Sequence, residues 1–186
     1  MKRIIAVMLF CFMLCGCSSA AVEMDSALSL RQKILSANIC SFDAKVTADY
    51  AEEVYTFTLR CTADSNGNVS FSVTEPETIA GISGSITDAG GNFSFEDTVL
   101  AFETLAVDSV SPVIAPWLFL RSLRSGYISH CSDTDSGIVI DIDDTYRGTN
   151  LHTEIFLDRE GLPEGAEMYY DGRRILTVSV ANFVIL

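Results

Sequence analysis

The stretch SFDAKVTADYAEEVYTFTLRC, residues 41–61, alternates apolar and polar side chains almost throughout. The apolar positions are Phe42, Ala44, Val46, Ala48 and Tyr50 in its first half, and Tyr55, Phe57, Leu59 and Cys61 in its second half. Strict alternation is typical of a β-strand that has one buried and one solvated face. The stretch therefore predicts two strands that form a hairpin over a common core.

The register of this hairpin is constrained, because both apolar faces must point to one core and paired positions must then sum to an odd number. One allowed register sets Cys40 opposite Cys61, with the turn at Tyr50 and Ala51, and would permit a disulfide in an oxidising compartment. The other registers separate the two thiols. In the alternative interpretation these cysteines and Cys131 are buried small hydrophobic residues, since free cysteine is among the most buried residue types.

Shorter alternating segments follow on both sides of residues 111–126 and are separated by turn signals such as SNGN, DAGGN and YRGTN. They cover residues 69–73, 82–86, 93–95, 138–142, 151–157, 166–170 and 174–186. The total is about ten strands, without the alternation of strands and long helices that parallel sheets require. We predict an α+β fold that is mainly antiparallel β, in the form of a curved, half-open β-barrel.

Two segments change to helical spacing, and both are available to cover the apolar inside face of the sheet. In MDSALSLRQKILSAN, residues 24–38, Asp25 or Ser26 is the expected cap, and the apolar positions are Leu28, Leu30, Ile34 and Leu35. In SPVIAPWLFLRSLRSG, residues 111–126, Pro116 suits the first helical turn and Gly126 suits the end. We predict one N-terminal helix and one short inserted helix.

The beginning of the chain has the layout of an export signal. Lys2 and Arg3 precede an apolar run at residues 4–14, which is too short to span a bilayer, and Gly16 stands just before Cys17. The order LCGC resembles the bacterial lipobox, in which the signal is removed before a cysteine that then carries lipid. We expect a signal peptide at 1–16, a lipidated Cys17 with a tether at 17–24, and one domain at 25–186. In the alternative, the signal is an ordinary one and Cys17 has no role.

The composition indicates an exported, acidic, globular protein. The chain has 25 acidic and 12 basic side chains, a formal net charge of −13, and 48% apolar residues. This charge argues against nucleic acid as a partner, and it would be repelled by anionic lipid headgroups. We therefore expect the lipid on Cys17, and not a basic patch, to hold the protein on the extracytoplasmic side of the cell membrane.

No motif for catalysis is present. His130 and His152 are each isolated from any serine or cysteine motif, and we found no nucleophile elbow, zinc spacing or phosphate loop. Asp141, Asp143 and Asp144 are able to supply oxygen ligands, but their spacing matches no calcium loop, and an acidic edge that discourages strand pairing is the better interpretation. We predict a protein that is not an enzyme, with no catalytic residue, no metal and no cofactor.

The order of elements resembles the LolA and LolB lipoprotein carriers and the related mycobacterial lipoproteins of the LppX kind. The resemblance rests on the N-terminal helix, the succession of antiparallel strands and the apolar insertion at residues 111–126. It also rests on two motifs, TEPETIAGISGSI at 74–86 and the C-terminal stretch LPEGAEMYYDGRRILTVSVANF at 162–183. It covers about residues 25–186 and implies an unclosed barrel with a lid, whose hollow takes acyl chains. The matching lid residues are Trp117, Leu118, Phe119 and Leu120. In the alternative they fill the core.

Two functions follow from the resemblance. The first is an anchored lipoprotein that binds lipid or a lipidated chain in an apolar cavity, because a tether at Cys17 favours a resident or receptor role over free shuttling. The second is a partner-binding lipoprotein that supports a cell-envelope or spore-cortex enzyme, as in similar lipid-anchored proteins of spore-forming bacteria. In the second case the hollow is filled by the protein's own side chains.

Overall fold

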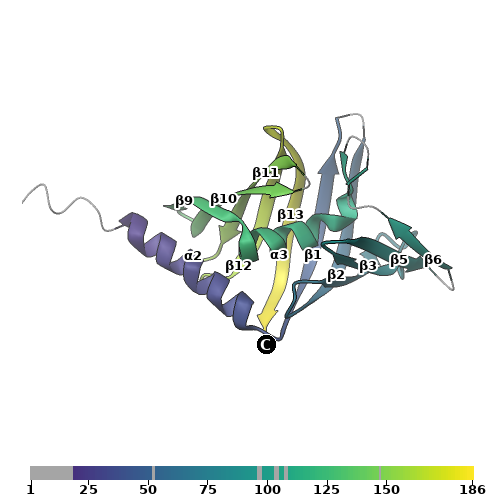
Figure 1. Cartoon of the computed structure of the whole chain (residues 1–186), viewed down its shortest axis with the longest axis horizontal. Helices are drawn as coiled ribbons and strands as arrows, with labels where there is room; N and C mark the ends of the chain where they lie inside the picture. Colours follow the sequence, from purple (N-terminus) through teal and green to yellow (C-terminus); the bar gives the residue numbers. More distant parts are fainter. Residues whose placement is uncertain (1–18, 52, 96–97, 103–104, 107–108, 147) are drawn as a thin grey trace, which may run out of the picture.

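A computed structural model of the chain describes residues 19–51, 53–95, 98–102, 105–106, 109–146 and 148–186. Within them lies an antiparallel sheet of eleven strands in the order β6-β5-β4-β3-β2-β1-β13-β12-β11-β10-β9 (Figure 1). Its strands are β1 (Ile39–Asp49), β2 (Val54–Asp64), β3 (Val69–Glu75), β4 (Ser83–Thr87), β5 (Gly90–Phe95), β6 (Thr98–Phe102), β9 (Tyr127–Asp133), β10 (Ile138–Tyr146), β11 (Thr149–Leu157), β12 (Pro163–Tyr170) and β13 (Arg173–Ile185). The remaining elements are α2 (Ser19–Ser36), the short pair β7 (Leu105–Ala106) and β8 (Ser109–Val110), η1 (Pro112–Ile114) and α3 (Ala115–Ser125).

The predicted hairpin is formed by β1 and β2. Val46 pairs with Phe57, so the paired positions sum to an odd number, as the common core requires. The register that would set Cys40 opposite Cys61 needs a turn at Tyr50 and Ala51. The observed connection is longer, because the backbone N–H of Tyr50 donates to the carbonyl of Glu53 at 3.0 Å. This longer connection shifts the register, and Cys40 pairs with Ala63 instead of Cys61.

Helix α2 begins at Ser19, so residues 19–24, which we expected to be a tether, are helical, and neither Asp25 nor Ser26 caps the helix. Its buried side carries Ala27, Leu30 and Ile34 at helical spacing. The predicted apolar positions Leu28 and Leu35 are about half exposed instead. The side of the helix that packs therefore differs from the predicted one by a rotation about the helix axis. No helix of the described residues is both long and apolar enough to cross a membrane.

Helix α3 lies across the concave face of the sheet and packs against β1, β10, β11 and β13 (Figure 1). Pro116 lies in its first turn and Gly126 is its C-cap, as predicted. A Cβ added at Gly126 would lie 2.2 Å from Cγ2 of Ile142, so the end of the helix rests directly on β10. A glycine is therefore required by this close approach.

Two arginines join α2, α3 and the sheet. Arg31 of α2 donates from Nε to the carbonyl of Leu123 at 2.6 Å and from Nη2 to that of Gly126 at 2.7 Å. Arg124 of α3 donates from Nη2 to the carbonyl of Ser65, in the turn after β2, at 2.8 Å. Leu123 and Gly126 lie at the carboxyl end of α3. The positive charge of Arg31 therefore also interacts favourably with the negative end of that helix dipole.

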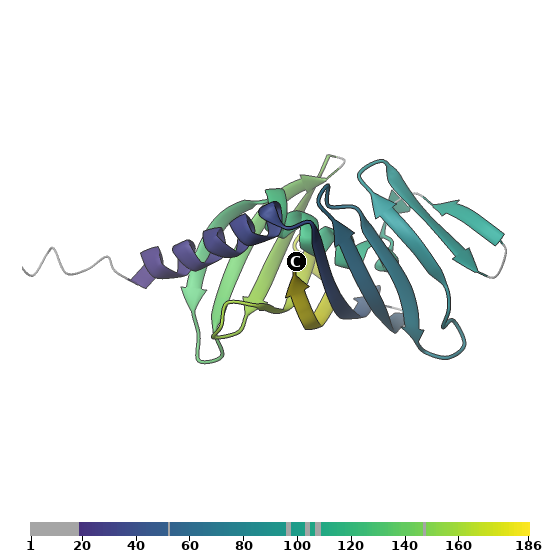
Figure 2. The ribbon, with the colours of Figure 1, turned by 90° about the horizontal axis from the view of Figure 1, so that it is seen from below.

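The core lies between α3 and the centre of the sheet, where Phe119 contacts Phe42 and Phe183 with ring centroids 5.7 and 6.4 Å apart. Figure 2 shows α2 beside the C-terminal strands, whereas β3 to β6 extend away from both helices at the other end of the sheet. The sheet does not close on itself, since β6 and β9 are its two edges. The predicted fold class, a half-open barrel with an N-terminal helix and a short inserted helix, is confirmed.

Candidate functional site

An apolar pocket of about 500 Å³ lies on the inner face of the sheet, beyond the end of α3. It is built from β2, β3 and β5, from the loop after β3, and from the segment at η1. The lining residues are Tyr50, Tyr55, Phe57, Phe71, Val73, Ile79, Ile82, Phe93, Ser111, Pro112 and Val113. None of these residues carries a carboxylate or a basic group, so among the described residues the lining is apolar with three hydroxyl groups.

The exposure of β2 shows why a pocket forms here. Leu59 and Cys61 are completely buried beneath the helical layer, Phe57 on the same face is half-buried, and Tyr55 is 46% exposed. The apolar alternation of the strand therefore continues past the point where cover by α3 ends. The inward positions beyond that point form the pocket.

The rim of the pocket is amphipathic. The rings of Tyr50 and Tyr55 lie 6.4 Å apart, and the hydroxyl of Tyr55 donates to the carboxylate of Glu53. Burial, with a smaller contribution from Tyr55, raises the pKa of Tyr50 to about 12, so this phenol stays neutral at physiological pH. The rim thus offers uncharged hydroxyl groups beside a carboxylate at the edge of an apolar surface.

The four predicted lid residues do not lie at this pocket. Trp117, Leu118, Phe119 and Leu120 are at most 2% exposed and belong to the packed core under α3. This placement agrees with the alternative in which they fill the core. The part of the insertion that does line the pocket is Val113, together with Ser111 and Pro112, immediately before α3.

The disulfide that one register would have permitted is not formed, and Cys40, Cys61 and Cys131 are free and buried, as in the alternative interpretation. Cys40 lies opposite Ala63, so Cys61 is a diagonal neighbour at a distance of ~7–8 Å between Cα atoms, beyond the range that a disulfide bridges. Burial raises the pKa of all three thiols, that of Cys61 to about 12. Cys17, the predicted lipidation site, lies outside the described residues.

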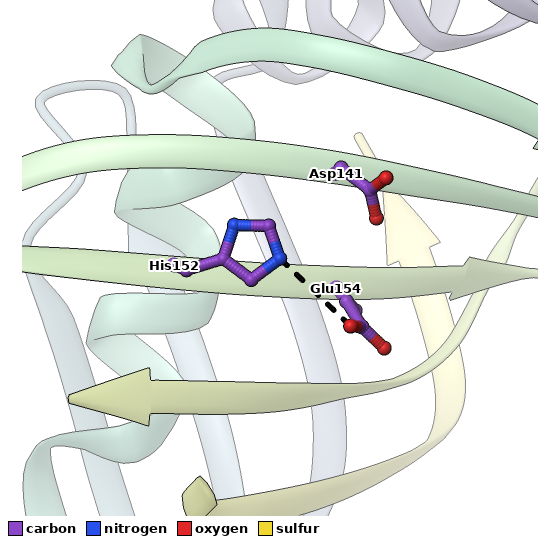
Figure 3. A group of neighbouring side chains, drawn as sticks. All are labelled: Asp141, His152 and Glu154. Carbon is purple, nitrogen blue, oxygen red and sulfur yellow. Dashed lines mark ion pairs between the residues drawn. The ribbon is translucent and has the colours of Figure 1, made fainter. Parts of the chain in front are cut away.

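On the opposite, outer face of the sheet, Asp141 of β10 lies close to His152 and Glu154 of β11 (Figure 3). One ligand atom from each residue falls within 4.8 Å of the others. Nε2 of His152 is 3.8 Å from Oε1 of Glu154, and Nδ1 is 2.8 Å from Oδ1 of Asp143. The hydrogen bond to His152 is the main reason that the pKa of Asp143 is lowered.

The sequence analysis missed this cluster because it treated His152 as isolated. The signal that would have found it is the pairing of β10 with β11, in which Tyr146 pairs with Thr149. With that register, Asp141 pairs with Glu154 and Asp143 pairs with His152. His130, the other histidine, lies on β9, pairs with Asp141 and is exposed.

No protein-family model matches the sequence, and no curated protein matches it significantly. Among solved structures, a putative outer membrane lipoprotein-sorting protein domain from Vibrio parahaemolyticus is similar, with a TM-score of 0.50 and 9% sequence identity. The similarity covers 90% of this chain and 93% of that chain. The chain shares the fold of that domain.

Two further structures are similar at lower scores. A LolA superfamily protein from Nitrosomonas europaea has a TM-score of 0.47 and 7% identity, over 86% of this chain and 93% of that chain. The lipoprotein LppX from Mycobacterium tuberculosis has a TM-score of 0.39 and 10% identity, over 89% and 96%. The predicted fold is confirmed by the similarity to the domain from Vibrio parahaemolyticus, and at such identities the likeness concerns the fold alone.

Proposed function

We propose that this protein binds an acyl chain, carried by a lipid or by a lipidated protein, in the apolar pocket between β2, β3, β5 and η1. The observation that carries the proposal is the pocket itself. Its lining is almost entirely hydrocarbon and its volume of about 500 Å³ falls in the ~300–1,000 Å³ range of small-ligand sites. The name of the structural neighbour from Vibrio parahaemolyticus, a lipoprotein-sorting domain, supports the same class of ligand.

Hydrophobic burial supplies the binding free energy, and no covalent step is needed. Each methylene removed from water contributes about 0.8 kcal/mol, so a buried segment of about eight methylenes gains roughly 6 kcal/mol before the cost of ordering. The neutral hydroxyl groups of Tyr50 and Tyr55 stand where the acyl chain would leave the pocket. They are suited to contact the ester or amide group at its polar end.

Lipidation of Cys17 would hold this binding domain at the extracytoplasmic membrane surface. The lipobox-like order at residues 14–17 supports this part of the proposal. Stable anchoring requires at least two acyl chains or a second membrane signal, because one chain binds a membrane only marginally. A diacylglycerol on the cysteine would satisfy that requirement.

Native mass spectrometry of the chain from Ser18 onward, purified without detergent, tests the binding. We expect a lipid-sized mass that remains on the protein, or saturable uptake of added phospholipid. Ile79 lines the pocket and is 37% exposed, so Ile79→Asp places a carboxylate in the pocket without disturbing the core. This variant should retain at least tenfold less lipid than the unmodified domain.

Leu162 provides a matched control, because it has the same exposure of 37% but lies in the turn before β12, away from the pocket. Leu162→Asp should retain lipid as the unmodified domain does. Equal loss in both variants would point to a general effect of surface charge. A protein that carries no lipid and takes up none would contradict the proposal.

A protein partner is the second candidate function, and the packing under α3 favours it. The partner-binding interpretation expects a hollow filled by the protein's own side chains, and Trp117, Leu118, Phe119 and Leu120 fill that space. If no lipid binds, the same apolar pocket is the surface to examine for a protein ligand. A pull-down with Ile79→Asp and Leu162→Asp as baits would then compare the same two positions.

A further inference from the structure

We propose that Asp141, His152 and Glu154 form a binding site for a divalent metal ion of the zinc type on the outer face of the sheet. The three side chains come from two neighbouring strands and project from the same face (Figure 3). Buried neighbours such as Ile140 and Ile155 point to the opposite face, toward the core. The site is therefore separate from the apolar pocket, which lies on the inner face.

The histidine is oriented for coordination. An ionised carboxylate only accepts hydrogen bonds, so the 2.8 Å contact from Nδ1 of His152 to Asp143 requires the proton on Nδ1. In the neutral imidazole, Nε2 then carries the free lone pair, and this atom faces Glu154 and Asp141. A carboxylate that holds the second nitrogen of a metal-binding histidine is a recurrent arrangement in metalloproteins.

The distances are close to those that zinc requires. Four-coordinate zinc with bonds of ~2.0–2.2 Å holds its ligand atoms about 3.4 Å from one another. Nε2 of His152 and Oε1 of Glu154 are 3.8 Å apart, and all three ligand atoms lie within 4.8 Å. Zinc binding therefore requires side-chain rotations that bring the three ligand atoms closer together. Three protein ligands of this kind leave one position for water.

The charges around the cluster also favour a cation. Among the described residues, the carboxylate of Glu167, which lies opposite Glu154 on the neighbouring strand β12, is paired with Arg174. Neither Asp141 nor Glu154 has such a pair with a lysine or arginine in the described part of the chain. These two carboxylates face each other across paired strands of a protein with a net charge of −13, so a bound cation would relieve their repulsion.

The mixed ligand set favours zinc over calcium or magnesium. Calcium takes six to eight oxygen ligands, and magnesium prefers oxygen and retains its waters, whereas zinc accepts imidazole nitrogen together with carboxylate oxygen. The competing explanation is a protonated His152 that bridges the carboxylates as an ion pair. That arrangement would need no metal, and it predicts that zinc leaves the imidazole signals unchanged.

The test is a titration with Zn²⁺ at pH 7.5 of the full chain without an affinity tag. ¹⁵N NMR of the imidazole groups monitors each step of the titration. The chain has only two histidines, so two side-chain spin systems are expected. We expect Nε2 of His152 to shift saturably at one equivalent of zinc. Ca²⁺ and Mg²⁺ at the same concentration should leave it unchanged.

Variants distinguish specific coordination of zinc from nonspecific attraction of the cation to acidic groups. His152→Ala should abolish the saturable binding, and Asp143→Asn, which removes the carboxylate that orients the ring, should weaken it by about 10–100-fold. Asp133→Asn removes an equal charge outside the cluster and should change the affinity less than twofold. The proposal is overturned if zinc does not shift His152, or if His152→Ala binds zinc as the unmodified chain does.

Discussion

The side chains of Cys40, Cys61 and Cys131 are at most 5% exposed, and burial raises the pKa of each thiol. A raised pKa keeps a thiol protonated, and only the thiolate reacts with alkylating reagents. For Cys61, with a pKa of about 12, the thiolate fraction at pH 8 is lower than that of an ordinary cysteine by roughly a thousandfold. The native protein should therefore protect this thiol even from small reagents.

We predict that iodoacetamide at pH 8 labels none of these three thiols in the native domain within the time that labels them completely in guanidinium. Intact mass spectrometry counts the added groups. Labelling of the unfolded domain without reductant is the control, because three additions mean that no disulfide is present. One addition under those conditions would show that two of the three thiols are joined in a disulfide. A bridge between Cys40 and Cys61 would contradict the register described above.

Single residues were predicted well where one side chain alone determines the outcome. Pro116 and Gly126 were assigned to the two ends of α3 from backbone preference alone, and both assignments hold. His152 was not recognised as part of a cluster, because its partners belong to another strand. A residue's neighbours across a sheet depend on register, which a scan of spacing along the chain does not include.

At the level of the elements, contacts between helices rather than helix propensity fix how α2 and α3 lie. Arg31 is the principal polar connection, since it donates to the carbonyls of Leu123 and Gly126 at the end of α3. Burial lowers the pKa of this guanidinium, yet it remains charged at physiological pH. Its loss would leave carbonyl groups at the helix end without these donors.

We predict that Arg31→Ala lowers the free energy of unfolding by about 1.5–3 kcal/mol, the usual contribution of hydrogen bonds to a charged group. Urea denaturation followed by circular dichroism measures it. Lys33→Ala, an exposed position two residues away, should change stability by less than about 0.5 kcal/mol. If Arg31→Ala is as mild as Lys33→Ala, the two helices are held by apolar contacts alone.

The alternation in residues 41–61 predicted both strands of the first hairpin, their buried faces and the parity of their pairing. It did not predict the register itself, because the length of a connection is set by local turn geometry at positions 50–53. The start of α2 was placed too late for a similar reason. The polar residues Asp25 and Ser26 suit a cap, but the helix continues through them to Ser19.

At the scale of the whole molecule, the pocket depends on where α3 ends over the sheet. The family resemblance implied that the most apolar part of the insertion covers the cavity, with core filling as the alternative, and the structure places that part in the core. Strand pattern predicts which faces are apolar. It does not predict how far a helix of eleven residues reaches across eleven strands, so the pocket required three-dimensional information.

The expected attachment to a membrane also concerns the whole molecule, and substitution of Cys17 tests it. In a bacterial host, we predict that Cys17→Ala prevents incorporation of labelled palmitate and releases the protein from the membrane fraction. Cys15→Ala is the matched control, because Cys15 lies in the segment that we expect to be removed. Equal palmitate labelling in both variants would show that Cys17 is not the acylated residue.

The pairing of β1 with β13 has a consequence for how the protein acquires its structure. These strands come from opposite ends of the domain and lie side by side at the centre of the sheet, where Cys40 pairs with Ile185. Folding rates fall as contacts become more distant along the chain, so we expect this central ladder to form last and slowly. The sheet cannot be completed until β13 has been synthesised, and this delay would suit the export that residues 1–16 predict.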